Sequence, residues 1–96
     1  MSLLTEVKSK LETLKPELME KYPLAYIGIF GSIARGDNRA DSDVDILVDF
    51  TGPIGIRFVD LAEELEQKLG RKVDLLSKRG VRDKFYKLIE PDIIYV

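Results

Sequence analysis

The chain of 96 residues contains no cysteine and no histidine. Without thiols, disulfides, cysteine nucleophiles and thiolate zinc sites are excluded. Without imidazole, serine–histidine triads and histidine metal ligands are excluded as well. Any metal ion must therefore be bound by oxygen atoms, which favours Mg²⁺, Mn²⁺ or Ca²⁺. The lack of cysteine is compatible with a reducing cytosol, so we expect a cytoplasmic protein.

Long apolar runs and an excess of basic charge are also missing. No run approaches the roughly 20 apolar residues that span a bilayer, and we expect neither a signal peptide nor a membrane partner. Fifteen basic residues stand against 17 acidic ones, for a net charge of −2, which disfavours nucleic acid as a partner. A composition of 45% hydrophobic and 33% charged residues predicts a single folded domain over residues 1–96.

Apolar periodicity predicts alternating helices and strands. Helical spacing marks an opening helix, in which Pro16 causes a kink or starts a second short turn. A second helical stripe runs over 58–69 and ends at Gly70, a residue suited to a left-handed helix cap. A third helix is marked by Val81, Phe85, Leu88 and Ile89 and stops before Pro91. Strands are predicted over 25–30, 44–50, 72–77 and in the terminal IIYV. This order indicates an α/β (α+β) fold with helices packed on a small mixed sheet.

A glycine-containing loop follows the first predicted strand. Gly31 and Gly36 have the separation of a P-loop, but Asp37 follows where a P-loop has its lysine, and an acid there would repel phosphate. The glycine spacing of a dinucleotide-binding motif is absent too. Gly31-Ser32 therefore either binds a phosphate, through its backbone, the hydroxyl and the start of a short helical turn, or simply forms a tight turn.

The predicted strand over 44–50 has one apolar and one acidic face. Its apolar face must be the core side, and it consists of Val44, Ile46, Val48 and Phe50. On the other face Asp43 and Asp45 have Cα atoms about 6.6 Å apart, so their carboxylates can converge on one cation. Asp49 lies about 13 Å from Asp45, too far to share that site, and is expected at a solvated strand end.

A third acid, Asp74, interrupts the apolar strand KVDLLS. A neighbouring strand lies about 4.8 Å away, so Asp74 can join the other two carboxylates. At about 5 Å and a dielectric constant of about 20, each pair of carboxylates repels by about 3 kcal/mol. Such repulsion is rarely kept in a small domain unless a divalent cation offsets it. The alternatives are a solvated strand face for Asp43 and Asp45, and an edge-strand acid for Asp74.

Together these residues resemble a known family. Gly31-Ser32, ten intervening residues, Asp43-Val44-Asp45 and a later strand-borne Asp74 resemble the nucleotidyltransferase superfamily of DNA polymerase β. The run GSIARGDNRADSDVDILV is similar to the minimal nucleotidyltransferases of prokaryotes, which often serve as antitoxins of helical HEPN-type ribonuclease toxins. The resemblance implies that Gly31 and Ser32 hold the β- and γ-phosphates of ATP or another nucleoside triphosphate.

The resemblance also implies the catalytic and metal-binding roles. Asp43 and Asp45 would ligate two Mg²⁺ ions, with Mn²⁺ as a substitute. Asp74 would ligate the ion nearer the acceptor and position or deprotonate the acceptor hydroxyl. Arg35 would either pair with a phosphate or cover the sheet edge, and Arg39 is expected outside the site.

The implied reaction is transfer of AMP from ATP to a hydroxyl, most often a tyrosine, of a partner HEPN toxin in a hetero-complex. Nucleotidylation of a small hydroxyl compound and a non-catalytic binding module remain as alternatives. The basic segment 78–87 either contacts a partner or the triphosphate, or is the solvated side of a helix. The sequence predicts neither the base preference nor the oligomeric state.

Overall fold

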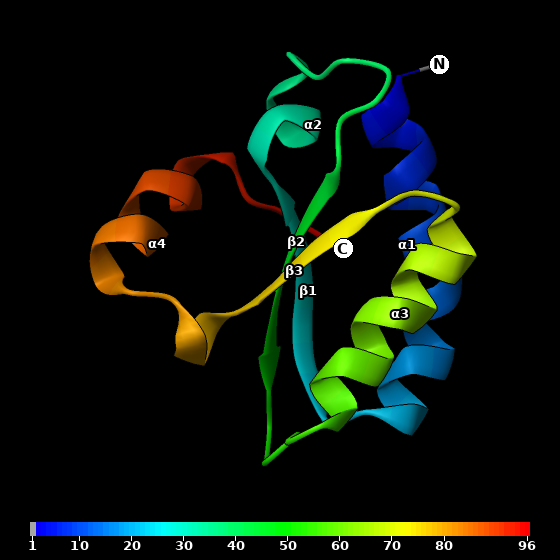
Figure 1. Ribbon diagram of the computed structural model, residues 1–96, viewed down its shortest axis with the longest axis vertical. Coiled ribbons are helices and arrows are strands. Elements are labelled where there is room, and N and C mark those ends of the chain that lie inside the picture. Colours follow the sequence, from blue (N-terminus) through cyan, green and yellow to red (C-terminus); the bar gives the residue numbers. More distant parts are fainter. Residues whose placement is uncertain (1) are drawn as a thin grey trace.

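The computed structural model describes residues 2–96 and is built around a four-stranded mixed sheet (Figure 1). In chain order the elements are α1 (Leu3–Lys21), β1 (Leu24–Phe30), α2 (Gly31–Arg35), β2 (Val44–Phe50), α3 (Arg57–Leu69), β3 (Val73–Ser77), η1 (Lys78–Gly80), α4 (Asp83–Ile89), η2 (Glu90–Asp92) and β4 (Ile94–Tyr95). The predicted α/β class and the predicted order of helices and strands are confirmed.

The sheet has the strand order β3-β2-β1-β4. Strand β1 is antiparallel to both β2 and β4, whereas β2 and β3 are parallel. A parallel pair needs a crossover connection, and α3 supplies it. Figure 1 views the sheet nearly edge-on, with α1 and α3 on one side and α4 on the other. Because β2 and β3 are parallel, their first residues meet at the same end of the sheet.

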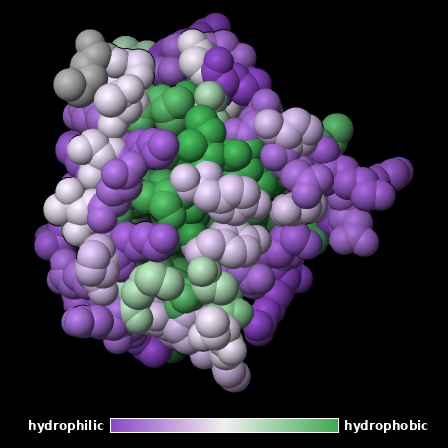
Figure 2. Space-filling model, turned by 180° about the vertical axis from the view of Figure 1, so that it is seen from behind, coloured by the Kyte–Doolittle hydropathy of each residue, from purple (hydrophilic) through white to green (hydrophobic). Residues whose placement is uncertain are grey.

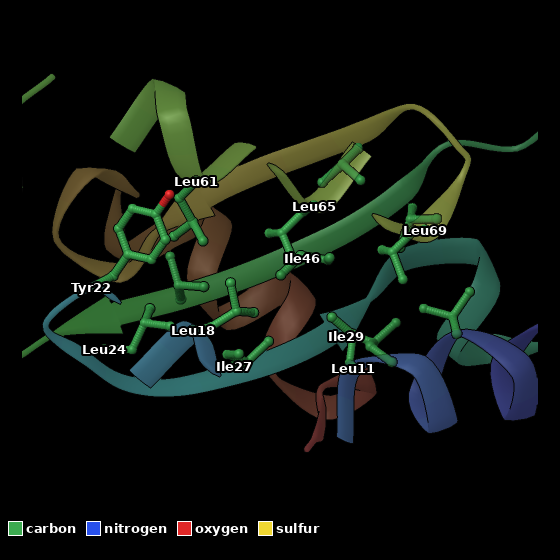
Figure 3. Close-up of a cluster of buried hydrophobic side chains, with 14 of the residues drawn as sticks. Leu11, Leu18, Tyr22, Leu24, Ile27, Ile29, Ile46, Leu61, Leu65 and Leu69 are labelled. Carbon is green, nitrogen blue, oxygen red and sulfur yellow. The ribbon is translucent and has the colours of Figure 1, made fainter. Parts of the chain in front are cut away.

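The larger hydrophobic core lies between the sheet and the pair α1 and α3. The predicted inner face of β2 is confirmed, since all four of its apolar side chains are buried: Val44, Ile46, Val48 and Phe50. In Figure 3 side chains from both helices point toward the strands. Leu11 of α1 and Leu65 of α3 are fully buried, as is Ile46 of β2. This packing holds the two parallel strands in a fixed position relative to each other.

A smaller cluster lies on the opposite face of the sheet, where α4 packs. It joins Phe30, Leu47 and Ile89. The predicted last helix is confirmed, but the residues that marked it differ in their placement. Phe85 and Leu88 are 43% and 74% exposed, and Val81 precedes the helix. The reason is that α4 begins only at Asp83 and makes about two turns, so that one narrow face reaches the sheet.

The two long helices, α1 and α3, agree with the predicted ones, apart from one alternative. α1 starts at the N-cap Ser2, whose Oγ accepts a hydrogen bond from the Thr5 N–H at 3.1 Å. It runs without a break past Pro16, so the alternative of a second short turn is wrong. α3 ends at Gly70, which has the predicted left-handed conformation (φ 67°). None of the helices described within residues 2–96 is both long and apolar enough to traverse a bilayer.

Candidate active site

Asp45 and Asp74 occupy neighbouring positions on the parallel strands β2 and β3. They are direct partners in the register of this pair, and a hydrogen bond links their side chains. Each is the second residue of its strand, so both carboxylates lie at the end of the sheet where β2 and β3 begin. Asp45 is half-buried and Asp74 is exposed on the outer strand. The carboxylate of Asp45 is therefore partly shielded by the protein, whereas that of Asp74 is accessible to an incoming molecule.

Asp43 lies just before β2 and is half-buried. Its negative charge acts on Asp45 strongly enough to raise the pKa of that carboxyl. However, in the described residues 2–96 no three histidine, cysteine or acidic side chains are already arranged to hold a metal ion. The convergence of Asp43, Asp45 and Asp74 on one cation therefore stays a prediction.

The surroundings of Asp45 disfavour its ionised form. Burial is the largest cause, followed by the negative charges of Asp74 and Asp43 and by the hydrogen bond with Asp74. Together they raise the pKa of Asp45 to about 6, although the positive charge of Arg35 acts in the opposite direction. The raised pKa shows that the negative charges of the three acids are not balanced by positive charge at this position.

The donor set fits a hard divalent cation. All the candidate ligands are carboxylate oxygens, which Mg²⁺ and Mn²⁺ prefer. A cation beside Asp45 would also counter the repulsion that raises its pKa. Asp43, Asp45 and Asp74 would hold such an ion.

The glycine at the start of α2 packs directly against Asp45. Gly31 has a φ of 76°, and a Cβ atom added to it would lie 3.0 Å from Cγ and 3.3 Å from Cβ of Asp45. The preceding residue, Phe30, is the partner of Asp45 in the antiparallel pair β1–β2. The pairing of β1 with β2 thus brings the start of the glycine loop against the acidic cluster. Only glycine fits there without strain or overlap.

The two polar residues of α2 differ in their contacts. Ser32 is half-buried in the first turn. Arg35 is exposed, and its Nε donates to Asp37 Oδ2 at 3.0 Å while its Nη1 donates to Asp92 Oδ2 at 3.5 Å. The contact with Asp92 was not predicted, because that residue lies 57 positions further along the chain. Arg35 is thus bound by carboxylates at the end of α2, near enough to Asp45 to affect its pKa.

Comparison with known proteins identifies the family. The family model described as a nucleotidyltransferase domain matches residues 11–95. The chain belongs to this nucleotidyltransferase family.

Three similar proteins illustrate the relationship. The protein adenylyltransferase MntA of Thermococcus cleftensis is 42% identical over 97 residues, which cover 100% of this nucleotidyltransferase and 98% of the relative. A solved protein assigned provisionally to the minimal nucleotidyltransferases is 30% identical, with a TM-score of 0.80 and coverage of 98% and 95%. A chain of a toxin–antitoxin crystal structure with AMP-PNP is 26% identical, with a TM-score of 0.61 and coverage of 86% and 63%.

These findings confirm the resemblance that the sequence motifs indicated. The family and the fold class are those expected, and the chain is an enzyme of the nucleotidyltransferase class. The match extends on both sides of the motif residues, which run from Gly31 to Asp74.

Two further groups of this nucleotidyltransferase lie outside the acidic cluster. Asp49, on the same strand as Asp45, forms an ion pair with Arg79 (Oδ1 to Nε, 3.6 Å) and accepts from the Phe50 N–H at 2.9 Å. In the basic segment, Arg79 also donates to the Phe50 carbonyl at 2.7 Å, and Lys78 Nζ lies 4.1 Å from the centroid of the Tyr86 ring. Lys78 and Arg79 of the basic segment therefore contact the fold, although Arg79 is still exposed to solvent.

The contact between Gly31 and Asp45 gives a prediction for stability. Gly31→Ala should lower the free energy of unfolding by about 2–4 kcal/mol, because strain at positive φ adds to overlap with the carboxylate. Gly36→Ala is the matched control: Gly36 has φ 84°, but an added Cβ would meet no atom within 4 Å. It should therefore cost only about 1 kcal/mol. Urea denaturation measures the free energy of unfolding of both variants. Equal losses of this free energy would contradict the predicted overlap.

Proposed function

We propose that this nucleotidyltransferase transfers AMP from ATP to a hydroxyl group of a partner protein, and that a bound divalent metal ion is required. The observation that carries the proposal is the half-buried Asp45, with its raised pKa, between Asp74 and Gly31. Support for ATP and a protein acceptor comes from the relative named protein adenylyltransferase and from the similar toxin–antitoxin structure with AMP-PNP.

In this proposal the chain's residues divide into two groups. Asp43, Asp45 and Asp74 hold two Mg²⁺ ions, or Mn²⁺ in their place, and Gly31, Ser32 and Arg35 bind the triphosphate. When bound, the metal ions stabilise the charge of the attacking and leaving oxygens. Arg35 exchanges its exposed contacts with Asp37 and Asp92 for phosphate oxygens, which a guanidinium binds through two parallel hydrogen bonds.

The chemical step needs no nucleophile from the protein. The acceptor hydroxyl oxygen forms a bond to the α-phosphorus of ATP, and the bond from that phosphorus to the bridging oxygen breaks. Pyrophosphate leaves with the electron pair of the broken bond, and the hydroxyl proton passes to the exposed carboxylate of Asp74. The chain holds both reactants in line and orients the acceptor, which is a large part of the rate enhancement in such transfers.

Asp74 is accessible to an acceptor hydroxyl carried on a protein. Asp74 is exposed and lies on β3, an outer strand of the sheet. A group carried on a large molecule can therefore approach it. We propose that the acceptor is a helical toxin of the HEPN type and that adenylylation silences it, so that this chain acts as an antitoxin.

A comparison of two labelled forms of ATP tests the proposed reaction. The purified chain is incubated with Mg²⁺ and a purified helical protein of the HEPN type, and ATP carries ³²P at either the α or the γ position. We expect the α label on the partner, no γ label, and no transfer in the presence of EDTA. Transfer of the γ label would indicate phosphorylation instead, and absence of both labels would contradict an enzymatic role toward this partner.

A further inference from the structure

The outer edge of β3 carries backbone groups that no other strand covers. Across the inner edge, the Val44 N–H donates to the Lys72 carbonyl at 2.9 Å. On the outer edge, the Val73 N–H donates to Glu66 Oε2 at 2.9 Å. Because successive residues of a strand direct their backbone groups to opposite edges, those of Leu75 and Ser77 also face outward. In Figure 1 the β3 edge is the part of the sheet nearest the viewer, with no element in front of it.

An apolar groove runs along this same edge. Its volume is about 480 Å³, and its main lining residues are Ile54, Phe58, Leu75, Leu76, Gly80 and Val81. Leu75 packs toward the core under α3, and Leu76 packs toward the cluster under α4. The groove therefore has walls on both faces of the sheet. A strand added to β3 would point its side chains alternately to these two walls.

Further apolar side chains adjoin the groove. Ile56 and Val59 are 83% and 52% exposed and follow the groove residues Ile54 and Gly55 along the chain. Exposed apolar side chains beside an uncovered strand edge are typical of a peptide-binding surface rather than of a solvated edge.

The groove and the candidate active site share strand β3. Asp74 belongs to β3 and directly precedes Leu75. A strand added beside β3 would lie about 4.8 Å away, so one of its residues would lie next to Asp74. In the added strand, the residues two positions before and after this one lie about 6.6 Å away from it, and their side chains point to the same face of the sheet. One of these two side chains would reach Leu76.

The exposed basic residues that follow the groove residues along the chain indicate what kind of segment would bind there. Arg82, Lys84 and Lys87 follow the groove residues Gly80 and Val81 and are exposed. The ion pairs formed within residues 2–96 involve Lys10, Lys21, Arg35 and Arg79 and leave these three charges without an acidic partner. An acidic segment complements them.

We infer that the β3 edge binds an acidic, extended segment of the partner protein as a fifth strand, with its acceptor hydroxyl beside Asp74 and an apolar side chain in the groove. This inference rests on the proposed function and specifies how the acceptor is recognised. The opposite edge of the sheet, formed by β4, cannot place an acceptor hydroxyl beside Asp74. Figure 2 shows apolar side chains at the centre of that face, but β4 lies three strand spacings, roughly 14 Å, from β3.

Two substitutions at Ser77 separate backbone pairing from other effects. Ser77→Pro removes an N–H that faces outward, and it removes no hydrogen bond between β2 and β3. Strands tolerate proline at such an edge position. Ser77→Ala is the matched control, because it removes the hydroxyl and keeps the N–H. The probe is the blocked peptide Asp-Ile-Gln-Tyr-Gln-Ile-Asp, whose symmetric pattern suits either strand direction.

Binding is measured by NMR on the full ¹⁵N-labelled chain, and AMP transfer to the peptide is measured in parallel. We expect the amides of Leu75 and Ser77 to shift, the alanine variant to bind like the wild type, and the proline variant to bind at least about five-fold more weakly. No shift at these amides up to about 5 mM peptide, or equal binding by both variants, overturns the inference. Because NMR reports binding without catalysis, a chain that binds the peptide at this edge but transfers no AMP would count against the proposed function alone.

Discussion

Replacing Asp45 by asparagine is expected to lower the rate of AMP transfer by at least about 10³-fold, the scale on which loss of a group that stabilises transition-state charge is felt. Asp45 is half-buried and touches the other functional groups: it pairs with Asp74 and packs against Gly31. Asparagine keeps the size of the side chain but removes the negative charge that would hold a cation. The measurement is the initial rate of α-label transfer at saturating ATP and Mg²⁺.

Asp49→Asn is the matched control for this experiment. Asp49 lies on the same strand and the same face as Asp45, but it pairs with Arg79 instead of the other acids. Its replacement should leave the transfer rate within about two-fold of the wild type, because no charge at the reacting atoms changes. Comparable losses in both variants would show that any neutralisation on this strand disturbs the enzyme, and the role given to Asp45 would be wrong.

The same Asp45→Asn change is expected to make the metal-free protein more stable at neutral pH. The pKa of Asp45 is raised to about 6 in the folded chain, from an ordinary value of 3.8. Between these two pH values the folded state binds more protons at this group than the unfolded state, so its stability falls as the pH rises from about 4 to about 6. Above about pH 6 the full penalty remains, at most about 3 kcal/mol by linkage, and asparagine removes it.

Urea denaturation in EDTA at about pH 4 and about pH 7.5 checks this prediction. The gain in unfolding free energy of Asp45→Asn over the wild type should be about 1–3 kcal/mol at the higher pH and much smaller at the lower pH. Asp49→Asn should show no gain, because it loses an exposed ion pair with Arg79. An equal gain in unfolding free energy at both pH values would contradict this prediction, because the effect would then come from packing rather than from charge.

Much of the fold could be predicted because local patterns and the core agree. The alternation along β2 identified its buried face correctly, since every second side chain of a strand points to the same side. The left-handed cap at Gly70 was predictable for a similar reason: helix ends favour a residue without a Cβ atom. The burial of the side chains of α4 was not predictable in this way. Which side chains of a short helix contact the sheet depends on the orientation of the helix, which local patterns do not specify. Phe85 and Leu88 have helical spacing and yet lie largely in solvent.

The site could be predicted in its parts but not in its contacts. Strand spacing indicated that Asp74 can approach Asp45, and the structure pairs these two residues. The fit of Gly31 against Asp45 depends on the pairing of β1 with β2, which no local pattern specifies. The contact of Arg35 with Asp92 depends on where η2 packs at the end of the chain. Spacing thus gives the residue types of the site, whereas tertiary packing determines their neighbours.

Isothermal titration of Mn²⁺ into the chain, with a non-hydrolysable ATP analogue present, tests most directly whether the acidic cluster binds a cation beside the triphosphate. Beyond the heat of Mn²⁺ binding to the analogue alone, the wild type should show a further saturable heat, and Asp43→Asn/Asp45→Asn should lose that further heat while remaining folded. Identical isotherms for the two proteins would contradict the assignment, because the cation would then be bound by the nucleotide alone or by other groups of the chain.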